Sequence, residues 1–311
     1  MHLVLSFAGA ASEPAAQAAS GLSLPHLERL LARLSPVHHD PGDALSLSPP
    51  HERALAAAWG WPVVDGLLPM AALAAAADGL APPDDGRGLA LIHPVHWHLG
   101  TEQVSLADPA GLDLGEAEAR ALFEALRPLA EDDGFALLWG APTRWYAAHA
   151  SFASLPSASL DRVIGRNVDL WLNSHADARR VRRLQAEAQM LWHTHAVNAQ
   201  REARGALPVN SFWLSGTGLP RAVPTLPDLQ ADHSLRSPAL AEDWAAWAEA
   251  WAALDAGPLR ELLQRAEQQQ PVALTLCGES HAQRWELRPR GWKQRWFGPR
   301  RADIAKLLHA L

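Results

Sequence analysis

The chain of 311 residues is long enough to bury a sizeable core, and an apolar fraction of 48% with 20% charged residues excludes an intrinsically disordered protein. Its formal net charge of −7 gives it no general attraction to nucleic acid or to a membrane surface. Cys277 is the one cysteine, which excludes an intramolecular disulfide and a zinc site made of cysteines; this suits the reducing cytoplasm, where we expect the protein.

The first quarter of the sequence predicts a buried strand followed by short helices. Residues 3–7 are mostly apolar and predict the strand, because the run lacks the basic start and the length of a signal peptide. Leu and Ala at helical spacing predict helices at residues 25–34, 51–59 and 69–77, and the Pro-, Gly- and Asp-rich residues 37–50 predict a loop. The Ala-rich run is too short to span a bilayer, so we expect no membrane partner.

Strands and helices then alternate. Strands are predicted at 89–98 and 103–106, pairing across residues 99–101, and again at 135–139 and 144–148, with an amphipathic helix at 115–127 between the two pairs. The second half predicts a long helix at 176–204 that Gly205 and Pro208 end, a strand at 209–214, a helix at 239–254, a hairpin at 271–277 and 283–287, and a last helix at 302–311.

This order of elements predicts an α/β fold. We expect a mixed sheet flanked by helices, a long central helix in the second half and a C-terminal β-hairpin. We expect one domain over residues 1–311, with two lobes at about 1–158 and 159–311 as an alternative.

The long helix carries polar side chains on the face that should be buried. On a continuous helix Leu184, Ala188 and Leu191 continue into His195 and Asn198. Buried polar groups need hydrogen-bond partners. Either these side chains bond the backbone of the following loop and strand, or they line a polar pocket for a ligand.

A family resemblance rests on this region. The run Glu187-Ala-Gln-Met-Leu-Trp-His-Thr-His-Ala-Val-Asn198 is followed by Arg201-Glu202, by Gly205 and by Val209-Asn-Ser-Phe-Trp-Leu-Ser-Gly-Thr-Gly218-Leu-Pro220. Together with Pro94-Val95-His96, Arg144-Trp145-Tyr146, Gly165-Arg166 and the Arg- and Trp-rich residues 285–301, these motifs resemble the RpfE-type regulatory proteins from about residue 90 onward.

The resemblance implies a non-catalytic regulatory or ligand-binding protein, associated with control of pathogenicity-factor expression, whose biochemical activity is unresolved. It implies an unknown protein or small-molecule partner. The expected ligand-binding residues lie on the long helix and the following strand: Glu187, His195, Asn198, Arg201, Glu202, Asn210, Trp213, Gly216 and Gly218. We read Ser215-Gly-Thr-Gly218 as a turn, with a phosphate-binding loop as the alternative.

The family is often labelled phosphoglycerate-mutase-like, which implies a metal-dependent phosphomutase or phosphohydrolase as the alternative function. Enzymes of that kind end their first strand in an Asp-Gly metal motif, whereas this strand ends Ser6-Phe7-Ala8-Gly9. Asp232-His233 is similar to the late metal-binding Asp-His pair of such enzymes.

A divalent metal has one further candidate site, and we predict no other cofactor. His96 and His98 point the same way on a strand, and Glu102 could return across the turn. With Asp232 they form the candidate ligand set; hydrogen-bonded or solvent-facing histidines are the alternative.

Two basic stretches and one aromatic stripe complete the candidates. Binding of nucleic acid or another anionic partner, the second alternative function, would use Arg288, Arg290, Trp292, Lys293, Arg295 and Trp296, with a solvated basic face as the default. The arginines at 179, 180, 182 and 183 open the long helix, where its dipole disfavours cations, and so predict carboxylates or an acidic partner nearby. Trp244, Trp247 and Trp251 share a helix face and predict burial.

Overall fold

The computed structural model describes residues 1–81, 83–101, 103–172, 175–288 and 303–311. They form two compact units that share the chain unevenly. Unit 1 comprises Met1–Ala44, Pro49–Pro62 and Pro224–Leu311, and unit 2 comprises Leu45–Ser48 and Val63–Val223. The division does not fall near residue 158, because unit 1 takes strands from both ends of the chain.

Unit 1 is built on a five-stranded mixed sheet with the order β2-β11-β10-β1-β9. The central strand β1 (His2–Leu5) pairs in parallel with β10 (Ala273–Cys277) and β9 (Leu229–Asp232). The strand β11 (Ala282–Glu286) is antiparallel to both β10 and β2 (Ser35–Asp40). Therefore β2, β10, β1 and β9 all run the same way, and their carboxyl ends meet at one edge of the sheet.

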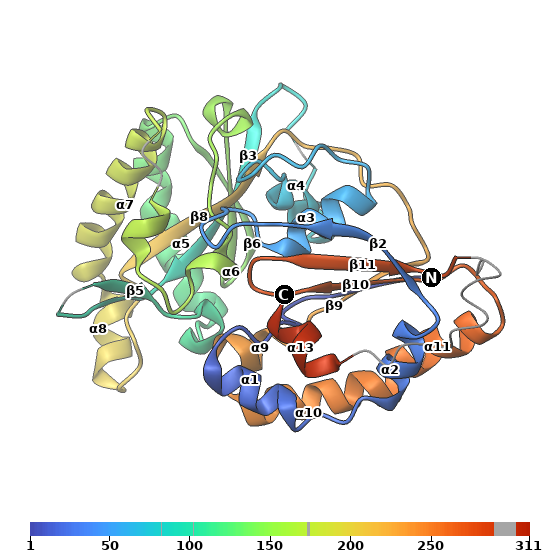
Figure 1. Cartoon of the computed structure of the whole chain (residues 1–311). Helices are drawn as coiled ribbons and strands as arrows, with labels where there is room; N and C mark the ends of the chain where they lie inside the picture. The colour runs from blue at the N-terminus through green and yellow to red at the C-terminus, as the bar shows by residue number, and fades with distance from the viewer. Residues whose placement is uncertain (82, 102, 173–174, 289–302) are drawn as a thin grey trace. The chain divides into compact units, whose positions relative to one another are not determined.

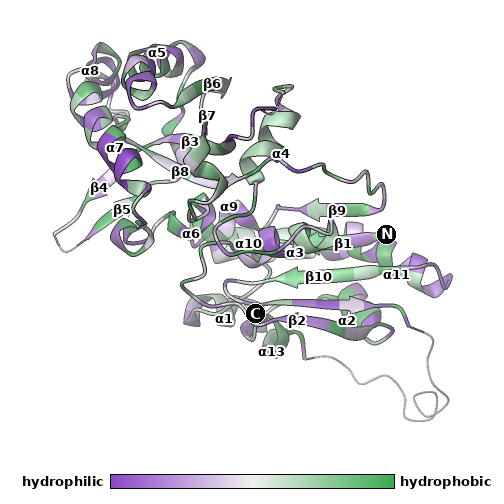
Figure 2. Cartoon of the chain, turned by 90° about the horizontal axis from the view of Figure 1, so that it is seen from above, coloured by the Kyte–Doolittle hydropathy of each residue, from purple (hydrophilic) through white to green (hydrophobic). Residues whose placement is uncertain are grey.

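Helices cover both faces of this sheet, as an α/β fold requires. One face carries α1 (Glu13–Ser20), α2 (Pro25–Leu31), α10 (Trp244–Leu254), α11 (Arg260–Glu267) and α13 (Ile304–His309), and α3 (Pro50–Ala58) lies on the other (Figure 1). Figure 2 shows that β10 is hydrophobic along its length. Its residues alternate between the two cores: Leu274 and Leu276 face the larger helical layer, and Cys277 packs with Leu55 of α3.

Unit 2 is built on a four-stranded antiparallel sheet with the order β6-β7-β3-β8. Its strands are β3 (Gly88–Val95), β6 (Ala136–Ala141), β7 (Arg144–His149) and β8 (Ser211–Gly218). The helices α5 (Glu116–Asp132) and α7 (Ala178–His193) share a core with one face, and α4 (Met70–Ala77) packs on the other. A separate ribbon joins β4 (Trp97–Leu99) to β5 (Val104–Leu106). The short helices α6 (Leu160–Val163) and α8 (Ala196–Ala203) complete this unit, and α9 (Arg236–Leu240) belongs to unit 1.

The fold class expected from the sequence is confirmed. The sheet of unit 1 is mixed and flanked by helices, and β10 and β11 form the C-terminal hairpin. Trp247 and Trp251 are fully buried in the helical layer, as the stripe on their helix predicts. That helix is part of the long helical stretch of the second half, because α10 continues through a π-helical turn at Asp255–Leu259 into α11.

Several predicted elements were wrong in detail. The helix at 176–204 is interrupted, because His195 adopts an extended conformation and its side chain caps the new helix α8. Residues 215–218 do not form a turn or phosphate loop but continue β8. Residues 35–40 form the edge strand β2, where Pro36 is tolerated, and α5 runs past its predicted end at Arg127 through Pro128. None of the described helices is long and apolar enough to cross a membrane.

Candidate functional site

The turn after β1 holds a strained residue at the carboxyl edge of the sheet. Phe7 has a φ of 57°, a left-handed conformation that is uncommon for a residue with a side chain. Three hydrogen bonds fix the turn: Ser6 N–H to Asp232 O (3.1 Å), Ala8 N–H to Cys277 O (2.8 Å) and the Trp247 indole to Phe7 O (3.0 Å). Strain of this kind persists only where its surroundings over-determine it, and it concentrates at functional sites.

The side chain of Ser6 meets a histidine from the neighbouring strand. Its Oγ lies 2.9 Å from Nδ1 of His233, the residue after Asp232 at the end of β9, and 3.2 Å from the Asp232 carbonyl oxygen. Ser6 is only 1% exposed, whereas His233 is exposed. If the hydroxyl donates to the carbonyl, Nδ1 of His233 donates to Ser6. If the hydroxyl donates to Nδ1, the two groups form a nucleophile–base pair.

A second imidazole lies beside this pair. His51 stands in the first turn of α3 and is buried; its ring centroid lies 6.0 Å from that of His233, edge to face, and 5.4 Å from that of Phe7. We call Ser6, His51, Asp232 and His233 the carboxyl-edge cluster. Ligands of open α/β sheets bind outside the carboxyl ends of the strands, which is where the cluster lies.

The neighbouring part of the same edge is closed by an ion pair. Arg53 of α3 donates to Asp40 at the end of β2 (2.7 Å) and to the carbonyl oxygen of Ser280 (3.0 Å). Cys277, at the end of β10, is fully buried, and burial raises the pKa of its thiol, so the sulfur stays protonated and unreactive at neutral pH.

The cluster lacks the carboxylates of a two-metal centre. Asp232 is its one carboxylate, and one oxygen of that carboxylate accepts the backbone N–H of Ser234 (2.8 Å). Among the residues that the structure describes, no three His, Cys, Asp or Glu side chains gather closely enough to hold a metal ion.

The residues predicted on the long helix lie in unit 2, where two of them bind backbone. The Asn198 amide donates to the carbonyl oxygens of Trp192 (2.8 Å) and Val209 (2.7 Å) and accepts from Val209 N–H (2.9 Å). Arg201 is fully buried and donates to the carbonyl oxygens of Leu207 (2.8 Å) and Leu112.

Arg201 also reaches a carboxylate. It donates to Glu118 of α5 (2.8 Å), which binds Arg204 as well (2.7 Å); the Arg204 and Arg201 guanidiniums lower the pKa of this carboxyl. His195 is half-buried and caps α8, accepting from Val197 N–H, while Glu187 is half-buried and Glu202 is exposed. Of the two alternatives for these polar residues, hydrogen bonding to the backbone therefore holds for Asn198 and Arg201.

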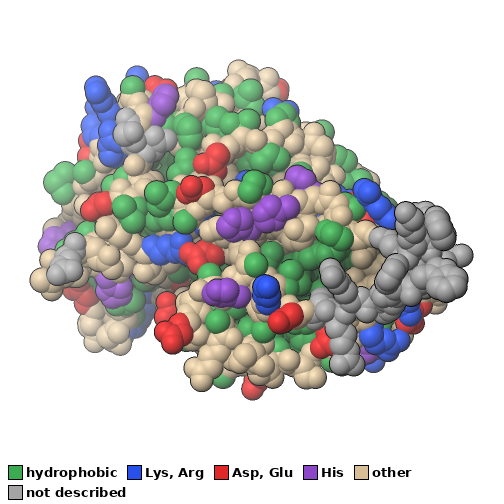
Figure 3. Space-filling view, viewed as in Figure 1, with side chains coloured by type: hydrophobic (Ala, Val, Ile, Leu, Met, Phe, Trp, Pro, Cys, Tyr) green, Lys and Arg blue, Asp and Glu red, His purple; other side chains and the backbone are tan. Residues whose placement is uncertain are grey.

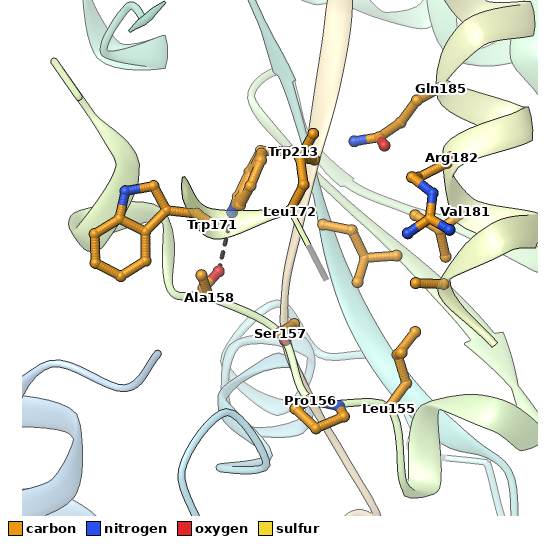
Figure 4. Close-up of a pocket in the computed structure, with 12 residues that line it drawn as sticks. Leu155, Pro156, Ser157, Ala158, Trp171, Leu172, Val181, Arg182, Gln185 and Trp213 are labelled. Atoms are coloured by element: carbon orange, nitrogen blue, oxygen red, sulfur yellow. Dashed lines mark hydrogen bonds between the residues drawn. The ribbon is translucent and has the colours of Figure 1, made fainter. Parts of the chain in front are cut away.

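The remaining residues of the predicted ligand set lie on or beside β8. Gly216 and Gly218 have positive φ values, and a Cβ at Gly216 would come within 2.9 Å of Ala71 N, so these glycines let α4 approach the strand closely. Trp213 donates to the Ala158 carbonyl oxygen (2.9 Å) beside a cavity of about 40 Å³, which Val181, Arg182 and Gln185 of α7 also line (Figure 4). That volume suits a water molecule rather than a larger ligand.

The predicted metal ligands are divided between the units. His96 and His98 lie in unit 2 with ring centroids 4.5 Å apart, and Nδ1 of His96 bonds the Pro208 carbonyl oxygen (2.8 Å). Burial lowers the pKa of His96. Asp232 lies in unit 1, and Glu102 lies outside the described residues.

The predicted anion-binding residues are mostly beyond the described part of the chain. Arg288 is exposed, and Arg290, Trp292, Lys293, Arg295 and Trp296 lie outside the described residues. On α7, the carboxylates expected near the arginine cluster are present in part, because Arg183 pairs with Asp133 at the end of α5.

Sequence reasoning noted Ser6 and Asp232-His233 separately and missed His51. No periodicity indicated that strands over 220 residues apart are neighbours, and a histidine at the start of a helix carries no signal of its own.

Comparisons with known proteins leave the family open. No protein-family model and no curated protein matches the chain, so the RpfE-type resemblance stays a prediction. Among solved structures, the chain is similar to a cofactor-independent phosphoglycerate mutase from Thermoplasma acidophilum, with 13% identity, a TM-score of 0.39, and coverage of 98% of this chain and 94% of that one. It is also similar to the PH0037 protein from Pyrococcus horikoshii, with 10% identity, a TM-score of 0.48, and coverage of 92% and 87%.

Proposed function

We propose that this chain is a cytoplasmic regulatory protein of the RpfE type that binds a small anionic ligand at the carboxyl-edge cluster without converting it. The observation that carries the proposal is the contact between Ser6 and His233 on a turn held by a strained Phe7, with His51 alongside. Strain and convergent polar groups at the carboxyl ends of parallel strands are features of binding sites.

The chemistry of the cluster favours an anion that presents oxygen acceptors. His51 stands in the first turn of α3, where the helix dipole favours negative charge, and imidazole N–H groups donate to phosphate or carboxylate oxygens. In this binding role the hydroxyl of Ser6, which is almost completely buried, orients the His233 ring.

Calorimetric titration with inorganic phosphate and phenyl phosphate tests this proposal. We expect saturable binding to the wild-type chain that weakens at least about tenfold in His233→Asn and His51→Asn, because each change removes a donor from the ligand. His175→Asn is the matched control, since His175 is an exposed histidine of unit 2. Unchanged affinity in both cluster variants, or no binding by the wild-type chain, would refute the proposal.

A second candidate function is hydrolytic, and the same contact favours it. When the Ser6 hydroxyl donates its hydrogen bond to Nδ1 of His233, Ser6 can act as a nucleophile and His233 as its base. Turnover of p-nitrophenyl phosphate or p-nitrophenyl acetate, measured with and without added zinc or manganese, would separate the candidates. Turnover that Ser6→Ala abolishes while phosphate binding persists favours a hydrolase; turnover that His96→Asn abolishes points to the metal candidate instead.

Two other parts of the chain are candidate surfaces for a partner. On the long helical segment, Glu202 is exposed and Glu187 and His195 are half-buried, so these three side chains are accessible to a partner, whereas Asn198 and Arg201 are not. Nucleic-acid binding would rest on the stretch that begins at Arg288 and predicts affinity that falls steeply with salt. The net charge of −7 and the interspersed acidic and basic side chains on the face in Figure 3 do not favour it.

A further inference from the structure

Two tryptophans of α10 share the same surroundings and differ in one contact. Trp247 and Trp251 are fully buried in the same helical layer, and their rings meet edge to face. The Trp247 indole donates to the carbonyl oxygen of Phe7 (3.0 Å), whereas the buried indole N–H of Trp251 has no acceptor among the described residues. Core packing accounts for both rings, but the hydrogen bond of Trp247 reaches the turn that carries the carboxyl-edge cluster.

This bond acts on the peptide group that joins Phe7 to Ala8. The carbonyl oxygen of the group accepts from Trp247, and its N–H donates to the carbonyl oxygen of Cys277 on β10 (2.8 Å). The group is therefore held at both ends, by α10 on one side and by the sheet on the other. It cannot rotate without breaking both bonds and leaving their buried partners unpaired.

Phe7 needs such a restraint, because a φ of 57° is unfavourable for a residue with a side chain. The cost of a left-handed conformation is similar to the net contribution of one hydrogen bond. Loss of the indole bond is therefore enough to shift the turn toward a relaxed conformation. Ser6 directly precedes Phe7, and the Phe7 ring lies beside His51, so the shift would displace groups of the cluster.

We infer that Trp247 is a positioning residue for the carboxyl-edge cluster. Through the Phe7 carbonyl it keeps the Ser6 hydroxyl against His233 and the Phe7 ring against His51. Trp247 is buried in the helical layer, so it acts on a ligand through the turn and not by contact. The inference rests on the proposed function, because a chain whose site is already formed binds its ligand more tightly.

Phosphate affinity of two matched variants tests the inference. Trp247→Phe and Trp251→Phe remove the same atoms from the same buried layer, but the first also breaks the bond to the turn. By calorimetric titration of the full-length chain with inorganic phosphate, we expect Trp247→Phe to weaken binding at least about fivefold and Trp251→Phe less than about twofold. Equal losses of affinity in the two variants would overturn the inference.

Glycine at position 7 separates positioning from packing. Because glycine adopts a positive φ without strain, a Phe7→Gly chain forms the turn without the indole bond. In that background we expect Trp247→Phe to change phosphate affinity less than about twofold. If Trp247→Phe alone does not fold, the double variant should. A double variant that shows the full loss of affinity, or that is equally unfolded, would assign Trp247 to the core alone and contradict the inference.

A readout without ligand keeps this inference distinct from the proposed function. The ring nitrogens of His233, assigned with His233→Asn, report the contact of Nδ1 with Ser6 in nitrogen-15 NMR spectra. We expect their signals to shift in Trp247→Phe and to stay in place in Trp251→Phe. If the wild-type chain binds no phosphate, the proposed function fails and these spectra decide the inference. His233 signals that Trp247→Phe leaves in place would refute the positioning role, whatever the affinity for phosphate.

Discussion

Single polar residues that the sequence places on buried faces do two different things in this protein. In unit 2, Asn198 and Arg201 bind backbone carbonyl groups and close the segment that follows their helix. In unit 1, Ser6 binds the ring of His233, which is an exposed residue. Polar groups of the first kind hold the fold, and we propose that those of the second kind orient a ring that contacts a ligand.

Removing the Asn198 side chain should lower the stability of the protein. Replacing Asn198 with alanine leaves two buried carbonyl oxygens and the Val209 N–H without their partner. We expect Asn198→Ala to lower the free energy of unfolding by about 2–4 kcal/mol, measured by urea denaturation.

The matched control for this change is Glu202→Ala, four residues along the same helix. Glu202 is exposed, so its loss should change the free energy of unfolding by no more than about 0.5 kcal/mol. Equal effects of the two substitutions would contradict a structural role for Asn198.

How far the sequence predicts such residues depends on where their partners lie. Asn198 is buried, as the helical spacing predicts, although the continuous helix on which that prediction rested is interrupted at His195. The spacing could not predict that the Val209 backbone is the partner, since that depends on the path of the loop between α8 and β8. The Ser6–His233 contact was beyond prediction for a stronger reason: it needs the parallel pairing of β1 with β9.

At the scale of elements, the sequence predicts where helices and strands lie better than where they are interrupted. The break between α7 and α8 was missed because Thr194 and His195 look permissible in a helix. The His195 side chain accepts a hydrogen bond from Val197 N–H and so starts a new helix at this point. The π-helical turn between α10 and α11 contains Pro258, which cannot donate a helical hydrogen bond.

That π-helical turn also positions the start of another helix. Asp255, its first residue, is buried and accepts from the backbone N–H of Leu27 (2.8 Å) and His26 (3.2 Å), and from the His26 ring (2.9 Å). Leu24, at the N-cap of α2, makes no side-chain capping bond, so Asp255 supplies the cap from 228 residues away.

We therefore expect Asp255→Ala to destabilise the protein by about 2–3 kcal/mol, because it leaves two N–H groups at the start of α2 without an acceptor. Asp255→Asn, which keeps one oxygen, should lose roughly half as much. The control is Asp228→Ala, since that side chain is 78% exposed. Chemical denaturation of the three variants checks the order, and an Asp255→Ala value close to that of Asp228→Ala would contradict the capping role.

At the scale of the whole molecule, the α/β class was predictable and the division of the chain was not. Alternating strand and helix patterns identify the class. The sheet of unit 1, however, joins β1 and β2 from the start of the chain to β9, β10 and β11 from its second half. A strand's pattern shows which face is buried and does not show which strand it pairs with.

This long-range sheet makes the stability of unit 1 depend on pH through His2. His2 lies on β1 with Nε2 2.8 Å from Thr275 Oγ1 of β10, and burial, with Arg284 nearby, lowers its pKa to about 4. Its pKa in the unfolded chain is about 6.5. Below pH 6.5 the unfolded chain takes up a proton that the folded unit does not accept until about pH 4, so stability falls as the pH falls through this window.

Between pH 7 and pH 5 this difference amounts to about 2 kcal/mol. We expect His2→Gln, which cannot take up the proton, to lose that part of the pH dependence relative to the wild-type chain. Urea denaturation at the two pH values measures the change for both chains. If His2→Gln keeps the full slope, His2 is protonated in the folded unit at pH 5. The contact between β1 and β10 around it would then have to be open to water.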